Sequence, residues 1–409
     1  MSATGEPGSY RWAVIGVSTI VNALAWAARS TFALFYVAML DEFAWGRGPT
    51  ALGYSLSWLC FVVFAPVAGW LYDRWRARTV VTMGGLVLGL ALALTGQVTS
   101  LAQYYLCFGV LSAAGIACIV IPSTAIVTRW FVRSRGTAMG VLSTGTPASA
   151  VAFYPVNAWL IVTLGWRTAF IVFGSIVAAA TVSLALLYRD PPNDEERSRE
   201  AGAAETKATQ STPPAGEEWT LRRALQSTRF WAAFTMTALG VIGYQIMATH
   251  QVAHAVDRGF QYTTVVWLFT CGAGCTMAGN LLGGWLSDHF GRGWVFAFGS
   301  IVAIAGIGCL ALMSGPGDLP LLVLYTVSGF GFGMRIAQLS AIPADVFSGP
   351  HLGAILGVVQ AGGGLGGAIG PFLGGWLFDA TGGYQLAFAA ASFAIAGSAV
   401  AAWIAAPRK

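Results

Sequence analysis

Long apolar runs follow one another along almost the whole chain. We count twelve stretches near or above the ~20 residues that a helix needs to cross a hydrocarbon core of ~30 Å. Backbone polar groups in lipid must find partners inside their own segment, so runs of this kind form helices. The predicted helices are 12–39, 51–72, 78–98, 102–128, 136–163, 166–188, 229–256, 262–287, 293–314, 318–343, 351–378 and 383–406.

The composition also favours an all-α membrane protein. Apolar residues make up 56% of the chain and charged residues 10%, whereas soluble domains carry about 25% charged residues. The first apolar run is too long for the core of a cleavable signal, so we expect it to stay as the first helix. No room is left for a soluble catalytic domain, and no catalytic motif stands out, so we expect that the protein is not an enzyme.

Two unrelated motifs occur twice at nearly the same spacing. GWLYDRWRAR begins at Gly69 and GWLSDHFGRG begins at Gly284, which is 215 residues later. GTAMGVLSTG begins at Gly136 and GAILGVVQAG at Gly353, which is 217 residues later. This pattern indicates one membrane unit built twice, and repeated membrane halves are typical of transporters that bind their substrate between the halves.

One long polar stretch, about 189–228, separates the repeats. Its proline, charged and small polar residues predict a flexible linker, and its end, TLRRALQST (220–228), predicts a short interfacial helix. We therefore expect an N-terminal six-helix half (1–188), a cytoplasmic linker (189–228) and a C-terminal six-helix half (229–409).

Basic residues favour one side of the predicted membrane protein. If the N-terminus is cytoplasmic, seventeen Lys and Arg residues fall on that side and three, Arg47, Arg167 and Arg258, on the other. This predicts a multi-pass protein of the cell membrane, the inner membrane in a bacterium, with both termini in the cytoplasm. The basic bias needs no nucleic-acid partner. All six cysteines lie in apolar runs without a ligand cluster, so we expect no metal or cofactor.

The two repeated loops resemble the signature GxLxDRxGRR of the major facilitator superfamily. This resemblance covers the full chain and implies the twelve-helix major facilitator fold. It also implies that a charged latch on the cytoplasmic side gates transport. The positions that match the signature and carry charge are Asp73, Arg74, Arg78, Asp288 and Arg292. Arg76 stands where the family has Gly and Ala77 where it has Arg, which implies a weaker first latch.

Five further segments look like the monocarboxylate transporter and oxalate/formate antiporter branch. They are FAWGRG (43–48), TRWFVRSRGTAMGV (128–141), THQVAHAVDRGF (249–260), PADVFSGPHLGAILGV (343–358) and GPFLGGWLFDATGGYQLAF (370–388). The resemblance implies transport of small organic anions, by symport with a proton or by antiport, and a protein that works as a monomer.

Ionisable residues inside the predicted helices are the strongest guide to a substrate. Arg29, Arg335 and His250 lie in predicted helices 1, 10 and 7, which line the central cavity in the superfamily that the chain resembles. No Asp or Glu lies at the same depth. Two buried guanidinium groups without acids favour an anionic substrate, because guanidinium can bind a carboxylate through two hydrogen bonds. A structural role for either arginine, or for His250, stays open.

Four polar residues complete the predicted substrate site. The branch places an arginine in helix 8 where this chain has Asn280, and oxalate exchangers place a lysine in helix 11 where Gln360 is the nearest polar residue. Gln338 is one turn from Arg335, and Gln245 is one to two turns from His250. Each of the four is also compatible with helix packing.

The sequence therefore predicts an alternating-access transporter of a small organic anion, a mono- or dicarboxylate, coupled to protons or working by exchange. The alternative is an efflux pump for neutral or cationic hydrophobic compounds, which ranks second because no acid is embedded in the membrane. The glycine strings 329–333 (GFGFG) and 362–370 (GGGLGGAIG) imitate dinucleotide-binding fingerprints, but within apolar helices they predict close packing.

Overall fold

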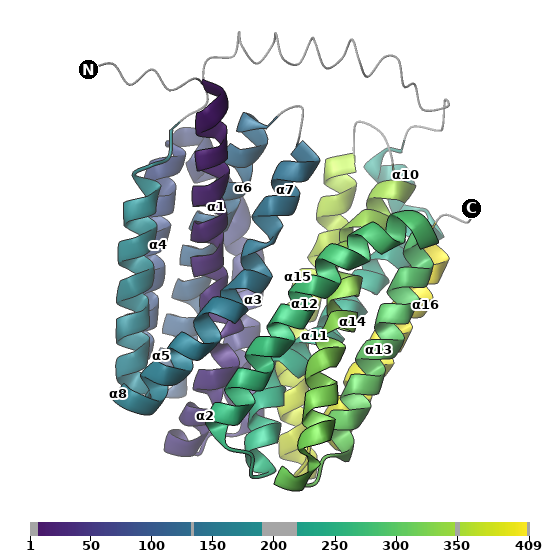
Figure 1. Cartoon of the computed structure of the whole chain (residues 1–409). Helices are drawn as coiled ribbons and strands as arrows, with labels where there is room; N and C mark the ends of the chain where they lie inside the picture. Colours follow the sequence, from purple (N-terminus) through teal and green to yellow (C-terminus); the bar gives the residue numbers. More distant parts are fainter. Residues whose placement is uncertain (1–6, 132–134, 190–218, 348–351, 407–409) are drawn as a thin grey trace.

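The computed structural model describes residues 7–131, 135–189, 219–347 and 352–406, and within these ranges the regular structure is helical. The helices form two groups that stand side by side (Figure 1). The first group consists of α1 (Pro7–Ser30), α2 (Phe32–Phe43), α3 (Arg47–Arg74), α4 (Ala77–Thr95), α5 (Leu101–Tyr104), α6 (Ser112–Trp130), α7 (Arg135–Ser143) and α8 (Gly145–Ala185). The all-α prediction is confirmed.

The second group begins after the predicted linker, of which residues 190–218 lie outside the described residues. It consists of α10 (Leu221–Leu225), α11 (Thr228–Asp257), α12 (Tyr262–Phe290), α13 (Arg292–Leu312), α14 (Leu319–Val346), α15 (Leu352–Thr381) and α16 (Gln385–Ala405). The short helix α10 lies within the segment 220–228, where the sequence predicts an interfacial helix.

Two predicted helices are broken near a threonine. The predicted helix 12–39 is divided into α1 and α2 at Thr31, and the predicted helix 136–163 is divided into α7 and the start of α8 at Thr144. Each hydroxyl donates to a carbonyl of the preceding turn, Thr31 to Ala27 at 2.7 Å and Thr144 to Val141 at 2.7 Å. Hydroxyls that bond back in this way compete with the helical ladder and bend helices.

Predicted helices 136–163 and 166–188 meet at Gly165 within α8. Gly165 has φ 76° and ψ 156°, a backbone conformation that side chains disfavour, and the chain turns there at the lower left of Figure 1. The described residues therefore contain eleven helices that are long and apolar enough to span a membrane, of which Ala138–Ala185, with 48 residues, is long enough for two crossings of ~20 residues.

Close glycine contacts pack the second group. A Cβ added at Gly279 of α12 would lie 2.1 Å from the carbonyl oxygen of Phe330, and one added at Gly333 of α14 would lie 2.0 Å from that of Thr276. A Cβ added at Gly366 of α15 would lie 2.5 Å from the carbonyl oxygen of Ala238 in α11. The prediction that both glycine strings serve helix packing is therefore confirmed.

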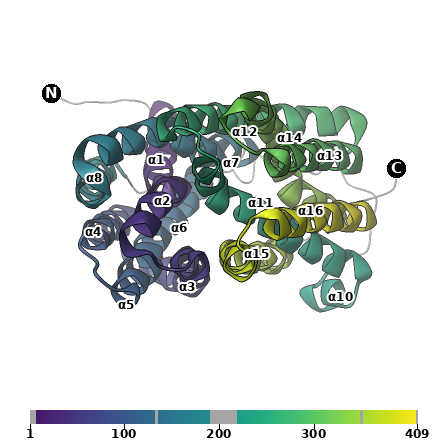
Figure 2. The same ribbon diagram turned by 90° about the horizontal axis from the view of Figure 1, so that it is seen from below.

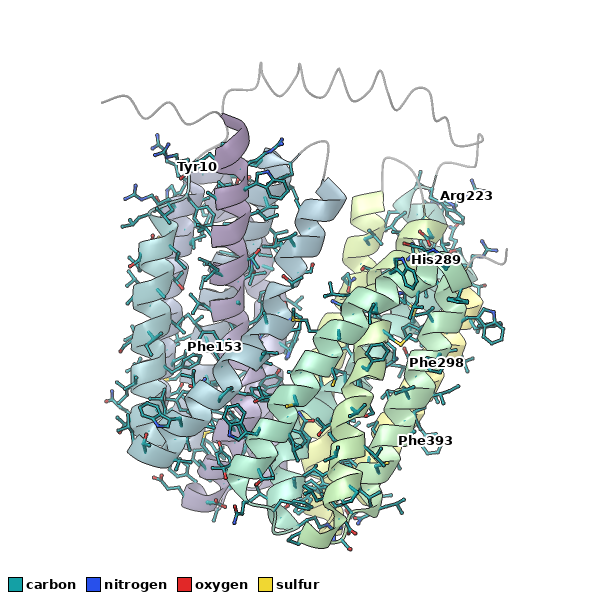
Figure 3. The ribbon with its side chains drawn as sticks, in the orientation of Figure 1. Tyr10, Phe153, Arg223, His289, Phe298 and Phe393 are labelled. Atoms are coloured by element: carbon teal, nitrogen blue, oxygen red, sulfur yellow. The ribbon has the colours of Figure 1, made fainter. Side chains whose placement is uncertain are left out.

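The outer surface of the bundle is apolar, as a lipid-facing surface must be. Phe298 and Phe393 point away from the second group in Figure 3 and are 56% and 78% exposed. Trp267 and Ile301 are exposed to a similar degree. So many large apolar side chains would be unfavourable in water but are favourable in contact with lipid hydrocarbon. The chain is therefore a multi-pass membrane protein.

Two seams join the groups. Helix α3 packs on α15, and α8 packs on α12, so each seam pairs one helix of each group (Figure 2). We call the side that holds α10, at the top of Figure 1, the linker side, and the side on which α2 ends and α3 begins the far side.

We expect Gly279→Ala to lower the melting temperature of the detergent-purified protein, because the new methyl group would overlap the Phe330 backbone. Overpacking of this kind costs about 1–3 kcal/mol. Gly274→Ala is the matched control, since it lies on the same helix and an added Cβ there meets nothing within 4 Å. Equal melting temperatures for the two variants would contradict this account of α12 packing.

Candidate functional site

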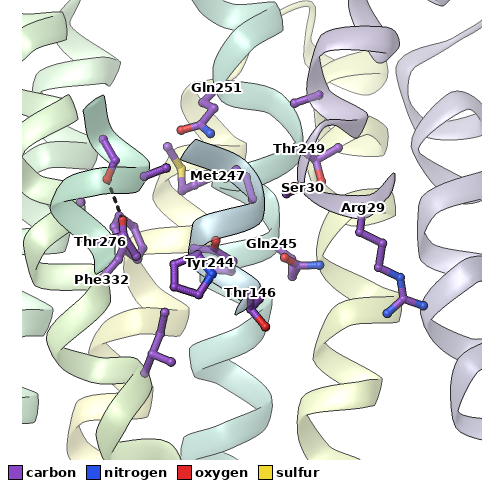
Figure 4. A pocket seen from close by; sticks show the side chains of 18 of the residues that line it. Arg29, Ser30, Thr146, Tyr244, Gln245, Met247, Thr249, Gln251, Thr276 and Phe332 are labelled. Carbon is purple, nitrogen blue, oxygen red and sulfur yellow. Dashed lines mark hydrogen bonds between the residues drawn. The ribbon is translucent and has the colours of Figure 1, made fainter. Parts of the chain in front are cut away.

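A cavity of about 480 Å³ lies between the two groups of helices (Figure 4). Its volume falls in the range of ~300–1,000 Å³ that is typical of small-molecule sites. Side chains from α1, α2, α3, α7 and α8 line it on one side, and side chains from α11, α12 and α14 line it on the other. The aromatic members of the lining are Trp26, Phe32, Tyr54, Trp58, Tyr154, Tyr244, Phe269, Tyr325 and Phe332.

Arg29 borders the cavity from the first group and is 3% exposed. Its Nη2 donates to the carbonyl oxygen of Ser57 at 2.7 Å, and its Nε donates to the Ser57 hydroxyl at 3.2 Å. Its guanidinium carbon lies 4.3 Å from the ring centre of Trp58, 5.0 Å from that of Phe61 and 5.3 Å from that of Trp26. Nη1 is buried without a hydrogen-bond partner. The charge is thus held by aromatic faces and one serine.

Arg335 borders the same cavity from the second group and is also 3% exposed. Its Nη2 donates to the Ser398 hydroxyl at 3.2 Å, and its guanidinium carbon lies 4.8 Å from the ring centre of Phe296. Its Nε is buried without a partner. Arg335 therefore repeats the arrangement of Arg29, with a hydroxyl and an aromatic ring in place of a carboxylate.

The cavity consequently carries positive charge. None of the described residues that line it is Asp, Glu or Lys, and no ion pair is found for Arg29 or Arg335 within the described part of the chain. Buried cations without counter-charges are costly, and each arginine still has an N–H to offer. Figure 4 shows Arg29 directed away from the other labelled side chains. In this conformation two of its nitrogens donate to Ser57, and Nη1 has no partner.

Neutral polar side chains line the cavity near the arginines. Gln245 donates through Nε2 to the Tyr54 hydroxyl at 3.3 Å, which links the two groups. Tyr325 donates to the amide oxygen of Gln251 at 2.5 Å, and the buried hydroxyl of Thr249 has no partner. Asn280 also lines the cavity, half-buried. These groups can orient a ligand by hydrogen bonding without adding charge.

The other predicted substrate residues lie outside the cavity lining. His250 is fully buried, with Nε2 2.8 Å from the carbonyl oxygen of Pro371 and Nδ1 3.4 Å from the Tyr384 hydroxyl. Gln338 donates to the carbonyl oxygen of Gly283 at 3.0 Å and ties α14 to α12. Gln360 is exposed on α15.

The structure thus brings four of the seven predicted substrate residues to one cavity. These four are Arg29, Arg335, Gln245 and Asn280.

A charged cluster joins the two groups on the far side. Asp379 at the end of α15 accepts the backbone N–H groups of Arg47 at 2.9 Å and Gly48 at 2.7 Å, where a carboxylate also suits the N-terminus of α3. The Arg47 guanidinium pairs with Asp257 at 2.7 Å and donates to the Tyr384 hydroxyl. We call Arg47, Asp257, Asp379 and Tyr384 the far-side cluster. It joins α3 of the first group to α11 and α15 of the second.

The sequence alone does not reveal a role for Arg47 or Asp379. Both stand in segments that carry the family resemblance, FAWGRG and GPFLGGWLFDATGGYQLAF, and both fall at helix ends. The sequence feature that could have indicated a contact is that these opposite charges lie at helix ends predicted to be on the same side of the membrane. Because these two residues are 332 positions apart, the sequence alone could not pair them.

The predicted latch residues on the linker side form pairs within single groups. Asp73 pairs with Arg129 at 3.4 Å in the first group, and Arg74 lies over the Trp70 ring at 4.8 Å. In the second group, Arg292 pairs with Asp288 at 3.1 Å and with Asp345 at 2.9 Å. Arg78 is exposed. In this conformation these residues stabilise each group internally, whereas the far-side cluster holds the groups together.

Comparison with known proteins gives a consistent picture. The sequence model of the Major Facilitator Superfamily matches residues 18–266 and 251–409. Monocarboxylate transporter 11 of Mus musculus is 30% identical, over 96% of this chain and 87% of the relative. Monocarboxylate transporter 12 of Rattus norvegicus is 25% identical, over 98% and 86% of the two chains. Monocarboxylate transporter 13 of Bos taurus is 28% identical, over 98% and 91%.

Solved structures share the fold at low sequence identity. A bacterial homologue of the human lysosomal transporter Spinster, in an inward-facing and occupied conformation, matches with a TM-score of 0.76 and 16% identity, over 98% of this chain and 97% of that one. The nucleoside transporter NupG matches with a TM-score of 0.69 and 15% identity, over 96% and 98%.

We expect Asp379→Ala to speed hydrogen–deuterium exchange of the Arg47 and Gly48 amides, because both donate to that carboxylate. Hydrogen bonds to a charged group contribute about 1.5–3 kcal/mol, which corresponds to roughly tenfold or more in exchange rate.

The matched control is Asp318→Ala on the same side. Asp318 accepts hydrogen bonds only from Ser314 and Gly315 among the described residues, so it should leave exchange at the start of α3 unchanged. Unchanged exchange in Asp379→Ala would contradict the assignment of these two hydrogen bonds, through which α15 holds α3.

Proposed function

This chain belongs to the Major Facilitator Superfamily, within its monocarboxylate transporter branch, and from that premise we propose that it moves a small organic anion, a mono- or dicarboxylate, by alternating access. Its relatives and its fold are those of transporters and not of enzymes. Its substrate is therefore a small molecule, and the protein works within a lipid bilayer.

One observation carries the choice of an anion. Two buried guanidinium groups, one from each group of helices, border the same cavity, and no acid lines it among the described residues. A carboxylate between them would supply the missing counter-charge. Once the Arg29 guanidinium turns toward the cavity, the carboxylate could accept from Arg29 Nη1 and Arg335 Nε, which now lack partners. Gln245 and Asn280 would orient the substrate from the lining. The names of the relatives, monocarboxylate transporters, agree with this assignment.

The transport cycle that we propose rocks the N-terminal half (1–188) against the C-terminal half (229–409). With both termini in the cytoplasm, the closed far side is the outside, and this conformation releases substrate inward. Opening the outside would break the far-side cluster. Closing the inside would bring the latch residues Asp73, Arg74, Arg78, Asp288 and Arg292 of the two halves together, and a single chain in the cell membrane suffices for this motion.

Coupling to protons and exchange of anions are both compatible with the site. His250 lies beside Tyr384 of the far-side cluster, so a proton on His250 would place positive charge near Arg47 and favour opening. Gln338 and Gln360 would act through helix contacts rather than on the substrate. Exchange needs no protonation step, because one anion simply replaces another between the two arginines.

An efflux pump for neutral hydrophobic compounds is the second candidate. Its support is the aromatic lining of the cavity, which suits an apolar ligand. Organic cations fit less well, because Arg29 and Arg335 would repel them at close range in a medium of low dielectric constant.

We expect carboxylates that bind to raise the melting temperature of the purified protein, and Arg29→Gln or Arg335→Gln to abolish this shift. A ligand at 100 times its dissociation constant adds about 2.7 kcal/mol to the stability of the folded state. Arg222→Gln is the matched control, because it removes the same charge from an exposed position on α10. A shift given only by neutral or cationic compounds, and indifferent to both arginines, would favour the efflux pump.

A further inference from the structure

The cavity is much larger than the smallest carboxylates. Its volume of about 480 Å³ corresponds to about sixteen water molecules at ~30 Å³ each. An acid with a three-carbon chain has about six non-hydrogen atoms and would displace only about six of these water volumes. The remaining water would screen the arginines and weaken their hold on the anion. A substrate that fills the cavity has about ten to fifteen non-hydrogen atoms.

Each group of helices contributes an aromatic wall. In the first group, the rings of Trp26 and Trp58 lie 5.9 Å apart at an angle of 38°. In the second group, Tyr244 and Phe332 meet edge to face, 5.8 Å apart at 64°. Walls of this kind bind a flat aromatic ring through its faces and edges better than they bind an aliphatic chain of similar size.

Tyr244 presents its ring to the open space of the cavity. It is 38% exposed although it lies in the middle of α11, whose neighbouring residues Gly243 and Gln245 are buried. Figure 4 shows Tyr244 near the centre of the cavity, close to Phe332. The Tyr244 ring is therefore available to stack on a ligand in the cavity.

Most of the cavity surface is apolar, and its polar part comes from the two arginines and from neutral side chains. Gln245, Thr249 and Gln251 lie within about two turns of α11, and the Thr249 hydroxyl is buried without a partner. The lining therefore combines a large apolar aromatic part with a limited positive and hydrogen-bonding part. This division matches a molecule with one apolar ring and one carboxylate.

We propose that the substrate is an aromatic carboxylic acid in its ionised form, an arylalkanoate of about ten to fifteen non-hydrogen atoms, whose ring stacks on Tyr244 and Phe332. This inference rests on the proposed function, because the carboxylate meets the same two arginines. Tyr244 is then a residue that determines specificity for the ring.

The test is a titration of the full-length purified protein with four probes, followed by calorimetry. Phenylacetate carries both the ring and the charge, cyclohexylacetate replaces the ring, acetate lacks it, and phenylacetamide lacks the charge. We expect phenylacetate to bind at least about tenfold more tightly than acetate and about 2- to 10-fold more tightly than cyclohexylacetate. Phenylacetamide should bind at least about tenfold more weakly than phenylacetate.

Tyr244→Leu should reduce the ratio of phenylacetate affinity to cyclohexylacetate affinity to about one, since the stacking partner is gone. Trp267→Leu is the matched control, because it removes an aromatic ring that is 61% exposed and does not line the cavity. The ratio should keep its wild-type value there. If Tyr244→Leu does not fold, the ratio measured with the wild-type protein still decides the preference for a ring.

The outcomes separate this inference from the proposed function. If acetate or cyclohexylacetate binds as tightly as phenylacetate, the aromatic substrate is wrong while an anion site stands. If phenylacetamide binds as tightly as phenylacetate, or if no carboxylate binds, the anion site itself is wrong. If the ratio survives in Tyr244→Leu, the ring lies elsewhere than on Tyr244.

Discussion

Two buried guanidinium groups without carboxylate partners are the constraint on which the rest of this structure depends. Arg29 and Arg335 lie in helices surrounded by apolar residues. Each donates to one serine, and Arg29 lies over three aromatic rings and Arg335 over one. Such an arrangement is costly in a medium of low dielectric constant unless an anion visits it. Because each group of helices supplies one arginine to the same cavity, we propose that an anion bound there serves as counter-charge to both. On this proposal, the bound substrate would also help to hold the two groups of helices together.

Helix α15 connects this site to the far-side closure. One face of α15 packs on α11 through Gly366 and Gly370, and the other packs on α3, where Gly367 lies against the Trp58 ring that also covers Arg29. At the far end of the same helix, Asp379 accepts the first backbone N–H groups of α3. A displacement of α15 from α3 would thus release Trp58 and the far-side cluster together. Glycine makes this close approach possible, since a side chain at these positions would push the helices apart.

The sequence predicted the helices well because the thickness of the hydrocarbon core sets their length. It also singled out Arg29 and Arg335, which border the cavity, because a charge in an apolar run is conspicuous wherever its side chain points. It did not show that His250 and Gln338 lie outside the cavity lining. Their hydrogen bonds to the carbonyl oxygens of Pro371 and Gly283 depend on how each helix is rotated and on neighbours distant in the chain. Arg47 was missed for the same reason. The breaks at residues 31 and 144 were missed because threonine is common in membrane helices and bends few of them.

Counterflow into proteoliposomes tests the central claim, that this chain carries organic anions across a membrane by alternating access. Vesicles preloaded with unlabelled phenylacetate are placed in a trace of the radiolabelled acid, with no ion gradient or membrane potential. The account predicts transient accumulation of label inside the vesicles, which protein-free vesicles do not show, because an alternating site exchanges anions whatever its coupling. Accumulation of neutral or cationic amphiphiles, with none for any carboxylate, would contradict it.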